Sequence, residues 1–138
     1  MGRIRIAIAG VGNCASALVQ GIEYYRDAPE APGGDFIAGL MNREVGGYRP
    51  GDIEVVAAFD IDRRKVGIPL NEAIFSPPNC TTRFAGPMPA PSPIVRMGPV
   101  LDGVAPHMSE YPEDRTFLPS PDTPCDVEAV LRESGAEI

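Results

Sequence analysis

The sequence predicts an α/β fold in which helices cover both faces of a parallel sheet. Three observations point to it. An alternating apolar segment at residues 3–9 leads through glycines into an amphipathic pattern, an almost unbroken apolar run fills residues 53–59, and a helix with start and stop signals lies near the C-terminus. Strands that alternate with helical patterns are typical of parallel sheets. The length of 138 residues suits one domain.

Composition excludes several classes of protein. Hydrophobic residues make up 43% of the chain and charged residues 22%, which is typical of a globular domain. A formal net charge of −7 gives little attraction for a nucleic-acid backbone, so we expect no nucleic-acid partner. The sequence holds no apolar run of about 18 residues and therefore predicts no membrane span. Three separate cysteines and one histidine predict no metal site and no disulfide framework.

The first predicted unit is a strand, a turn and a helix. Residues 3–9 read RIRIAIA, which is typical of a strand entering a buried sheet. A helix follows, and four apolar residues share one of its faces at helical spacing. They are Ala15, Leu18, Val19 and Ile22. Arg3 and Arg5 before apolar residues would also suit a secretory signal, but Gly10 and Asn13 break that stretch and no cleavage site closes it. We therefore expect a cytoplasmic protein.

The later elements are more widely spaced. We expect a long irregular insert at 27–52 with a short element at 36–41, because prolines and glycines crowd this stretch. The run at 53–59 predicts a strand covered on both faces. A short helix at 70–75 follows Pro69, and a short strand is expected at 94–97. Most of the 16 prolines lie between Pro69 and Pro124, so turns and extended backbone should dominate there.

The C-terminal segment predicts a capped helix and the start of another strand. Thr123 is the expected N-cap, Pro124 the first helical residue and Gly135 the C-terminal cap. Residues 136–138 then begin a strand-like pattern. Because a domain seldom stops at the entrance to a strand, we expect the sequence to be a fragment, with a truncated sheet.

Gly10, Gly12 and Ala15 form a GxGxxA pattern, which is the fingerprint of a dinucleotide site in a Rossmann-type fold. The first glycine permits the tight turn, the second lets the backbone approach a pyrophosphate, and the small third residue lets the helix pack on the strand. Amides at the helix start would stabilise the phosphate charge. The pattern has the required context, between a strand and a helix. A tight glycine turn without a ligand is the alternative.

Asp60 ends the second predicted strand, where dinucleotide folds place an acid that binds the adenosine ribose. Its distance from the glycines exceeds the usual spacing of about 20 residues because the 27–52 insert intervenes. The carboxylate favours NAD over NADP, whereas Arg63 and Arg64 nearby would favour NADP. A solvated strand end is the alternative reading of Asp60. The run Asp62–Lys65 is interpreted as a solvated surface.

Three further features are less specific candidates for a functional role. Cys14 lies at a helix start, where a thiol can become reactive, although a small residue beside the cofactor is the simpler interpretation. His107 near Asp102 could form an acid–base pair or be incidental. Residues 76–83 (SPPNCTTR) offer hydroxyl and amide groups without a recognised catalytic spacing.

The residues resemble one known family. GVGNCASALVQGIEYYRD at 10–27, VAAFDID-RRKVG at 56–67, EAIFSPPNCT at 72–81 and GPVLDGV at 98–104 are similar to bacterial and archaeal myo-inositol-1-phosphate synthases, also called inositol-3-phosphate synthases. The shorter GLM at 39–41, GGY at 46–48 and the ending DVEAVLRESGAEI agree. The resemblance covers nearly the whole chain and is more specific than a glycine motif.

The resemblance implies that residues 1–138 are the N-terminal part of a Rossmann-type NAD-binding domain. The cofactor would be NAD, and five residues would line its pyrophosphate: Gly10, Val11, Gly12, Asn13 and Cys14. Asp60 would bind the adenosine ribose. Family members are homo-oligomeric isomerases of inositol and phospholipid biosynthesis that convert glucose 6-phosphate to inositol phosphate through transient oxidation and re-reduction.

Family proteins are more than twice as long as this chain, so the resemblance implies that the catalytic and oligomerisation domain is absent. The catalytic residues are unknown, because the only lysine, Lys65, matches no family catalytic lysine. We expect the isolated chain to be inactive. Two alternatives stay open: a truncated nucleotide-binding module without catalysis, and another NAD(P)-dependent sugar dehydrogenase.

Overall fold

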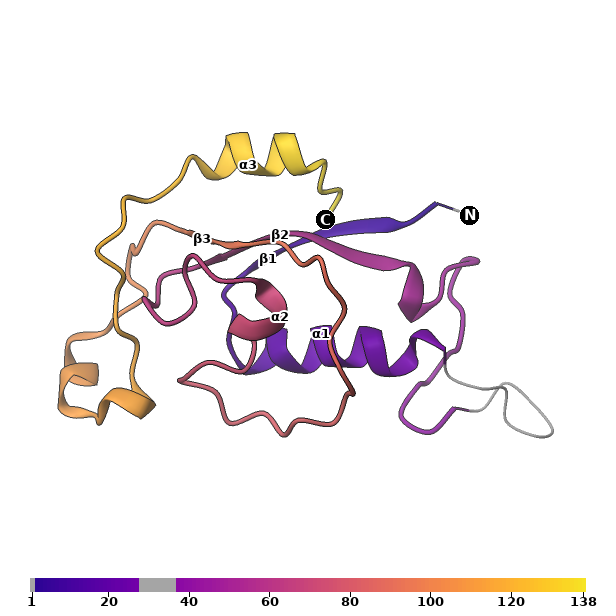
Figure 1. Ribbon diagram of the computed structural model, residues 1–138, viewed down its shortest axis with the longest axis horizontal. Coiled ribbons are helices and arrows are strands. Elements are labelled where there is room, and N and C mark those ends of the chain that lie inside the picture. The colour runs from indigo at the N-terminus through magenta and orange to yellow at the C-terminus, as the bar shows by residue number, and fades with distance from the viewer. Residues whose placement is uncertain (1, 28–36) are drawn as a thin grey trace.

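The computed structural model describes residues 2–27 and 37–138, and every structural statement below concerns these residues. The fold is α/β, as predicted, with a three-stranded parallel sheet in the order β1-β2-β3 (Figure 1). The strands and α-helices in chain order are β1 (Ile4–Ala9), α1 (Asn13–Arg26), β2 (Ile53–Asp60), α2 (Leu70–Ala73), β3 (Val95–Met97) and α3 (Val127–Ser134). Three 3-10 helices lie at Pro50–Asp52, Pro106–Glu110 and Glu113–Arg115.

The sheet is parallel because, after each strand, a helix or a long crossover carries the chain back to the end of the sheet where that strand began. β1 and β2 pair from Ile4↔Ile53 to Ala9↔Phe59, and β3 joins the last residues of β2. The final four residues of β2 are all buried. The predicted strands at 3–9, 53–59 and 94–97 are therefore confirmed to within one residue at each end.

The outer edge of β1 is occupied by the last two residues of the chain. The Ile138 amide donates to the Arg5 carbonyl at 3.3 Å, and the Ala7 amide donates to the Ile138 carbonyl at 2.8 Å. The Arg5 carbonyl accepts a shorter bond from the Glu137 amide at 2.7 Å, so residues 137–138 lie along β1 without forming a fourth strand. Figure 1 shows the C-terminus beside β1. The chain thus builds the sheet outward on one side of β1 and then returns to the other side.

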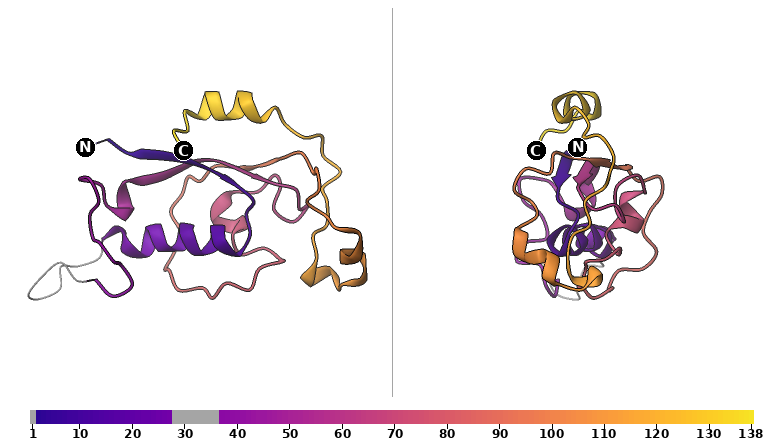
Figure 2. Two further views of the ribbon diagram at one scale, coloured as in Figure 1. Left: turned by 180° about the vertical axis from the view of Figure 1, so that it is seen from behind. Right: turned by 90° about the vertical axis from the view of Figure 1, so that its left-hand side faces the viewer.

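Helices cover both faces of the sheet, as predicted. Helices α1 and α2 lie on one face and α3 lies on the other, as the two views of Figure 2 show. The α1 face holds the buried core, whereas α3 has no fully buried side chain. The core cluster comprises Ile8, Val11, Ala15, Val19, Ala58, Leu70, Ala73, Ile74 and Val95.

Two predicted helix boundaries are wrong. The last helix begins at Val127 with Asp126 as its N-cap, and not at Thr123–Pro124. The reason is that the Cys125 amide donates to the Met97 carbonyl at 2.8 Å, which keeps the chain extended past Pro124, while the Asp126 carboxylate accepts from the Ala129 amide at 3.0 Å. Gly135 is the C-terminal cap in the left-handed conformation, as predicted. Helix α2 ends at Ala73, with Pro69 as its N-cap.

The insert between α1 and β2 is irregular where it is described. Isolated bridges join Ile37 to Leu40 and Val45 to Tyr48, and a 3-10 turn leads into β2. The element expected at 36–41 is thus a single bridge, and residues 28–36 lie outside the described part of the chain. None of the described helices has the length and apolar character needed to cross a membrane.

Candidate functional site

The glycine turn at the carboxyl end of β1 is held against β2. Gly10 has a φ of +91°, a conformation that favours glycine, and its amide donates to the Phe59 carbonyl at 2.8 Å. Gly12 is the N-cap of α1, and a Cβ built there would meet no other atom within 4 Å. The turn therefore presents open backbone, as the GxGxxA pattern predicted.

The first turn of α1 carries no competing charge or cap. Its N-cap, Gly12, makes no side-chain hydrogen bond, and no acidic residue stands in the first turn. The amides at a helix start lack partners within the helix and carry partial positive charge. Because β1 lies between β2 and the C-terminal segment, this helix start stands where the direction of sheet construction reverses, the usual place for a dinucleotide. The arrangement can accept an anionic group such as a phosphate.

Asp60 binds the glycine turn directly. Its Oδ2 accepts the Val11 amide at 2.7 Å, and its Oδ1 accepts the amides of Ile61 and Asp62, both at 2.8 Å. The side chain is therefore fixed at the end of β2, and the residue is only 9% exposed. A carboxylate has about four acceptor positions, so one remains for a further donor. The solvated strand end that stood as an alternative reading does not fit this burial.

A cavity of about 450 Å³ opens beside Gly10 and Asp60 at the carboxyl ends of the strands. The segment after β3, residues 98–103, supplies much of its wall. Only glycine fits at position 103 without a shift of the backbone, because a Cβ there would stand 2.9 Å from the Val100 carbonyl oxygen. The larger apolar residues of the lining are Phe59, Ile61, Val100, Leu101, Phe117 and Val127. A mostly apolar pocket that also contains two acidic residues, Asp60 and Asp102, suits a flat, partly polar group such as a nucleoside.

The interpretation of Asp62–Lys65 as a solvated surface is wrong for two of its residues. Asp62 and Lys65 are both 0% exposed. The Lys65 amide donates to the Asp62 carbonyl at 2.9 Å, so the chain turns immediately after β2 and places both side chains on its inner side. The Lys65 ammonium donates to the Val11 carbonyl at 2.6 Å, beneath the glycine turn. Arg63 alone keeps a more than half-exposed side chain.

Asp62 and Arg64 form a bidentate ion pair. The guanidinium donates from Nε to Oδ1 at 2.8 Å and from Nη2 to Oδ2 at 2.5 Å. Burial would raise the pKa of Asp62, but hydrogen bonds from Arg64 and from the Leu118 and Arg64 amides outweigh it and hold that pKa below 3.8. Arg64 also donates to the Thr116 carbonyl at 2.7 Å. This pair fastens residues 116–118, a wall of the cavity, to the end of β2, and it occupies Arg64.

Asn13 brings a distant segment to the helix start. Its Oδ1 accepts the Cys80 amide at 2.9 Å, and its carbonyl accepts the Thr81 hydroxyl at 3.0 Å. Residues 80–81 therefore lie against the first residue of α1, and the thiol of the next residue, Cys14, is exposed. The segment 76–83 has a positioning contact here that its spacing alone did not reveal.

Of the remaining sequence candidates, Asp102 lines the same cavity as Asp60, whereas His107 does not contribute to its wall. His107 is exposed in the 3-10 helix at 106–110 and meets the Tyr111 ring edge to face at 6.2 Å. Among the residues that the structure describes, no group of three His, Cys, Asp or Glu side chains could hold a metal ion.

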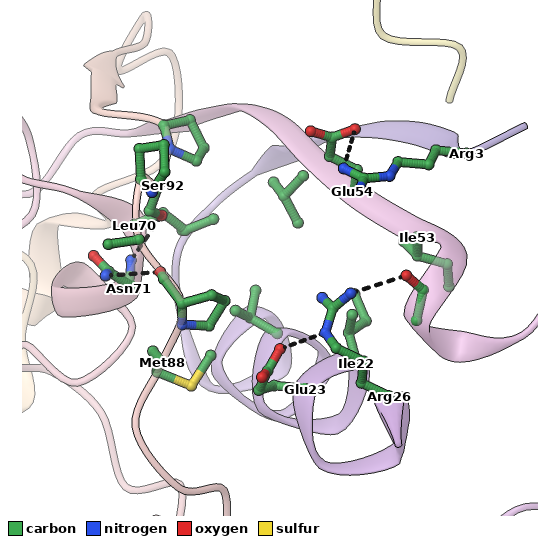
Figure 3. Close-up of a pocket in the computed structure, with 17 residues that line it drawn as sticks. Arg3, Ile22, Glu23, Arg26, Ile53, Glu54, Leu70, Asn71, Met88 and Ser92 are labelled. Carbon is green, nitrogen blue, oxygen red and sulfur yellow. Dashed lines mark hydrogen bonds and ion pairs between the residues drawn. The ribbon is translucent and has the colours of Figure 1, made fainter. Parts of the chain in front are cut away.

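A second cavity, of about 480 Å³, lies at the opposite end of the sheet (Figure 3). Its charged groups are paired: Arg3 with Glu54 at 3.4 Å, and Arg26 with Glu23 at 2.8 Å. Arg26 also donates to the Gly51 carbonyl at 3.0 Å. These pairs leave neither sign of charge in excess, and the amino ends of parallel strands are not where ligands of open α/β sheets bind.

The structure brings together Gly10, Val11, Gly12 and Asp60 as the sequence predicted, with Asn13 and Cys14 at the helix start. Sequence reasoning missed Lys65 and the Asp62–Arg64 pair. No local signal marked their burial, because charged residues after a strand are usually solvated and the contacts that bury these two are long-range ones to Val11 and Leu118.

The sequence was compared with those of known proteins. No known family model matches the chain. It is 44% identical to the inositol-3-phosphate synthase of Mycolicibacterium smegmatis over 137 residues, which is 99% of this chain and 35% of that protein. It is 47% identical to the inositol-3-phosphate synthase of Corynebacterium glutamicum over 116 residues, or 84% of this chain and 31% of that protein.

Solved structures agree on the fold. The crystal structure of Ari2 matches 98% of this chain and 36% of its own, with a TM-score of 0.71 and 34% identity. A myo-inositol-1-phosphate synthase-related protein from Thermotoga maritima matches 95% of this chain with a TM-score of 0.52 and 22% identity, which supports the fold alone. The chain spans about a third of the length of its curated relatives. Over that length, its sequence is similar to inositol-3-phosphate synthases at 41–47% identity.

Proposed function

We propose that residues 1–138 form the NAD-binding part of an inositol-3-phosphate synthase. The observation that carries the proposal is the hydrogen bond from the Val11 amide to the Asp60 carboxylate. It joins an open glycine turn to an acidic residue at the carboxyl end of β2, where the direction of sheet construction reverses. The sequence similarity supports the same cofactor.

The residues present fit a dinucleotide. The open space over Gly12 and the uncapped start of α1 suit a pyrophosphate, with Gly10, Val11 and Asn13 shaping the turn and Cys14 beside it. The free acceptor position on Asp60 suits a ribose hydroxyl, and the apolar cavity beside it suits the base. The Asp60 charge favours NAD over NADP. Of the two arginines that would favour NADP, Arg64 is held by Asp62, whereas Arg63 stays exposed.

NAD, when bound, supplies the reversible oxidation that lets a synthase of this family isomerise glucose 6-phosphate to inositol phosphate without net consumption of cofactor. This chain's own residues would bind and orient the cofactor. We assign no catalytic residue within 1–138, and we place the groups that act on the sugar phosphate in the catalytic and oligomerisation part of the family protein. On the same sequence similarity we propose a cytoplasmic homo-oligomer as the working form.

The test is a titration of the 138-residue chain with NAD and NADP by calorimetry, followed by incubation with NAD and glucose 6-phosphate. We expect saturable binding of NAD, weaker binding of NADP, and no inositol phosphate from this chain alone. Net formation of NADH would favour a sugar dehydrogenase. Inositol phosphate made by the chain would overturn the placement of the catalytic groups. Failure to bind either cofactor would overturn the proposed function itself.

A further inference from the structure

Val11 is held from both sides by buried charged groups. Its amide donates to Asp60 at 2.7 Å, and its carbonyl accepts from the Lys65 ammonium at 2.6 Å. Val11 and Lys65 are 0% exposed. The Pro78 carbonyl lies 3.5 Å from the same ammonium, so that Lys65 also touches the segment leading to Cys80. A lysine is rarely buried in this way without a specific partner.

The direction of the Val11 carbonyl has a consequence for the ligand side of the turn. A trans peptide unit is planar, and its C=O and N–H groups point in opposite directions. The Val11 carbonyl points to the buried ammonium, so the Gly12 amide of the same peptide unit points away from it. Lys65 therefore fixes the direction of a donor in the part of the turn where a phosphate would approach.

The charges around Lys65 also favour an anionic ligand. The ionised groups that act on it are Asp60, Asp62 and Arg64. Asp62 and Arg64 neutralise each other in their bidentate pair. Lys65 is left to balance Asp60, whose charge would otherwise oppose a phosphate beside the same turn.

We propose that Lys65 is a positioning residue for the pyrophosphate half of the nucleotide site, acting through the Val11–Gly12 peptide. The inference rests on the proposed function and extends it to a residue outside the glycine motif. It requires a charged ammonium. Burial lowers the pKa of Lys65 below 10.5, against the opposing effect of the Asp60 and Asp62 charges, so its charge is lost at lower pH than for an exposed lysine.

The test compares Lys65→Met with Arg63→Met, which removes the same charge from a more than half-exposed side chain two residues away. NAD and adenosine are titrated separately. Lys65→Met is expected to weaken NAD binding about tenfold, as an unpaired buried carbonyl would, and to leave adenosine binding within about twofold. Arg63→Met should bind both ligands as the unmodified chain does. Equal loss of NAD and adenosine by Lys65→Met would indicate a merely structural role and overturn the proposal, as would unchanged NAD binding.

Amide hydrogen exchange separates this inference from the proposed function, because it needs no ligand. Faster exchange of the Gly12 amide in Lys65→Met than in Arg63→Met would support the positioning of the Val11–Gly12 peptide by Lys65, even if the unmodified chain binds no NAD. Equal exchange in the two variants would overturn the proposal. If Lys65→Met does not fold, the pH dependence of NAD affinity in Arg63→Met replaces it. Affinity should fall as pH rises through the lowered pKa of Lys65 while adenosine affinity stays level, and a level NAD profile would overturn the proposal.

Discussion

The two ends of the sheet hold cavities of similar size but different chemistry. At the carboxyl end, a cavity of about 450 Å³ adjoins an open glycine turn, a nearly buried carboxylate and a buried ammonium. At the amino end, a cavity of about 480 Å³ is bordered by two exposed or half-exposed ion pairs. Volume alone would favour the amino end slightly. The carboxyl end differs because its polar groups are fixed by hydrogen bonds and leave donor and acceptor positions open.

The two ends of the sheet also differ in how deeply their charged residues are buried. Buried charges are costly unless they are paired and hydrogen-bonded, so the two fully buried charges in the turn after β2, Asp62 and Lys65, mark a place where geometry is fixed at some cost in stability. Exposed ion pairs such as those at the amino end contribute little to stability. Substitutions at the two ends should therefore have very different effects.

The largest effect is expected at Asp62. Asp62→Ala removes a fully buried partner of Arg64 and frees residues 116–118, so we expect a loss of about 3 kcal/mol in the free energy of unfolding. Urea denaturation measures it, with Glu128→Gln as the control, because Glu128 forms an exposed pair with Arg132. A loss no larger than that of the control would contradict the role of the buried pair.

Acid should remove the same contribution. The pKa of Asp62 in the folded chain lies below the ordinary 3.8, so its stabilisation is complete above that pH and is lost as pH falls through the folded-state pKa. The difference in unfolding free energy between the unmodified chain and Asp62→Asn should be constant near neutral pH and shrink below about pH 3.8. A difference that stays constant under acid would show that the carboxylate charge is not what stabilises the turn.

Gly12→Val should come next, acting mainly on binding. A Cβ at this position meets no atom within 4 Å outside its chain neighbours, and the φ of −99° suits any residue, so the melting temperature should fall less than for Gly10→Val. It fills the space where a pyrophosphate would approach, and we expect NAD affinity to fall about 100-fold, or about 2.7 kcal/mol. Gly10→Val is the contrast, because a φ of +91° strains any other residue and should lower stability as well. Normal NAD binding by Gly12→Val would mean that the site is elsewhere.

Asp60→Asn should change cofactor selectivity. Its amide oxygen can accept the Val11 amide, but its NH2 group then faces the amides of Ile61 and Asp62, which weakens the turn for both cofactors alike, while the charge that opposes the 2′-phosphate of NADP is gone. We expect the preference for NAD over NADP to fall about tenfold, or about 1.4 kcal/mol. Paired titrations with both cofactors measure it. Tighter binding of NADP than NAD by the unmodified chain would instead give the weight to Arg63.

The site residues at the carboxyl ends of the strands could be predicted from the sequence where local patterns determine their positions. Gly10 and Gly12 follow an alternating strand, and Asp60 ends an apolar run, so their order alone placed them together despite the intervening insert. Lys65 was not predictable in this way, because a charged run next to a strand is usually solvated. Its burial depends on the turn at Asp62–Lys65 folding beneath the glycine loop, a long-range contact with Val11.

The predicted start of α3 was wrong for a related reason. Thr123–Pro124 is a good local start signal, but the bond from Cys125 to Met97 holds the chain extended until Asp126 offers a second cap. Local propensity decides an element's existence, and tertiary hydrogen bonds decide where it begins. The same limit explains why residues 80–81 beside Asn13 had no sequence signature.

The smallest effect is expected at the amino end, from Glu54→Gln. Its partner Arg3 lies 3.4 Å away, and the two side chains are 43% and 68% exposed, so water screens the pair. We expect the unfolding free energy to change by less than about 0.5 kcal/mol and NAD affinity to stay the same. Calorimetry with NAD and urea denaturation measure both. A clear loss of NAD affinity would give the amino-end cavity a part in nucleotide binding, because Glu54 lines that cavity and not the carboxyl-end one.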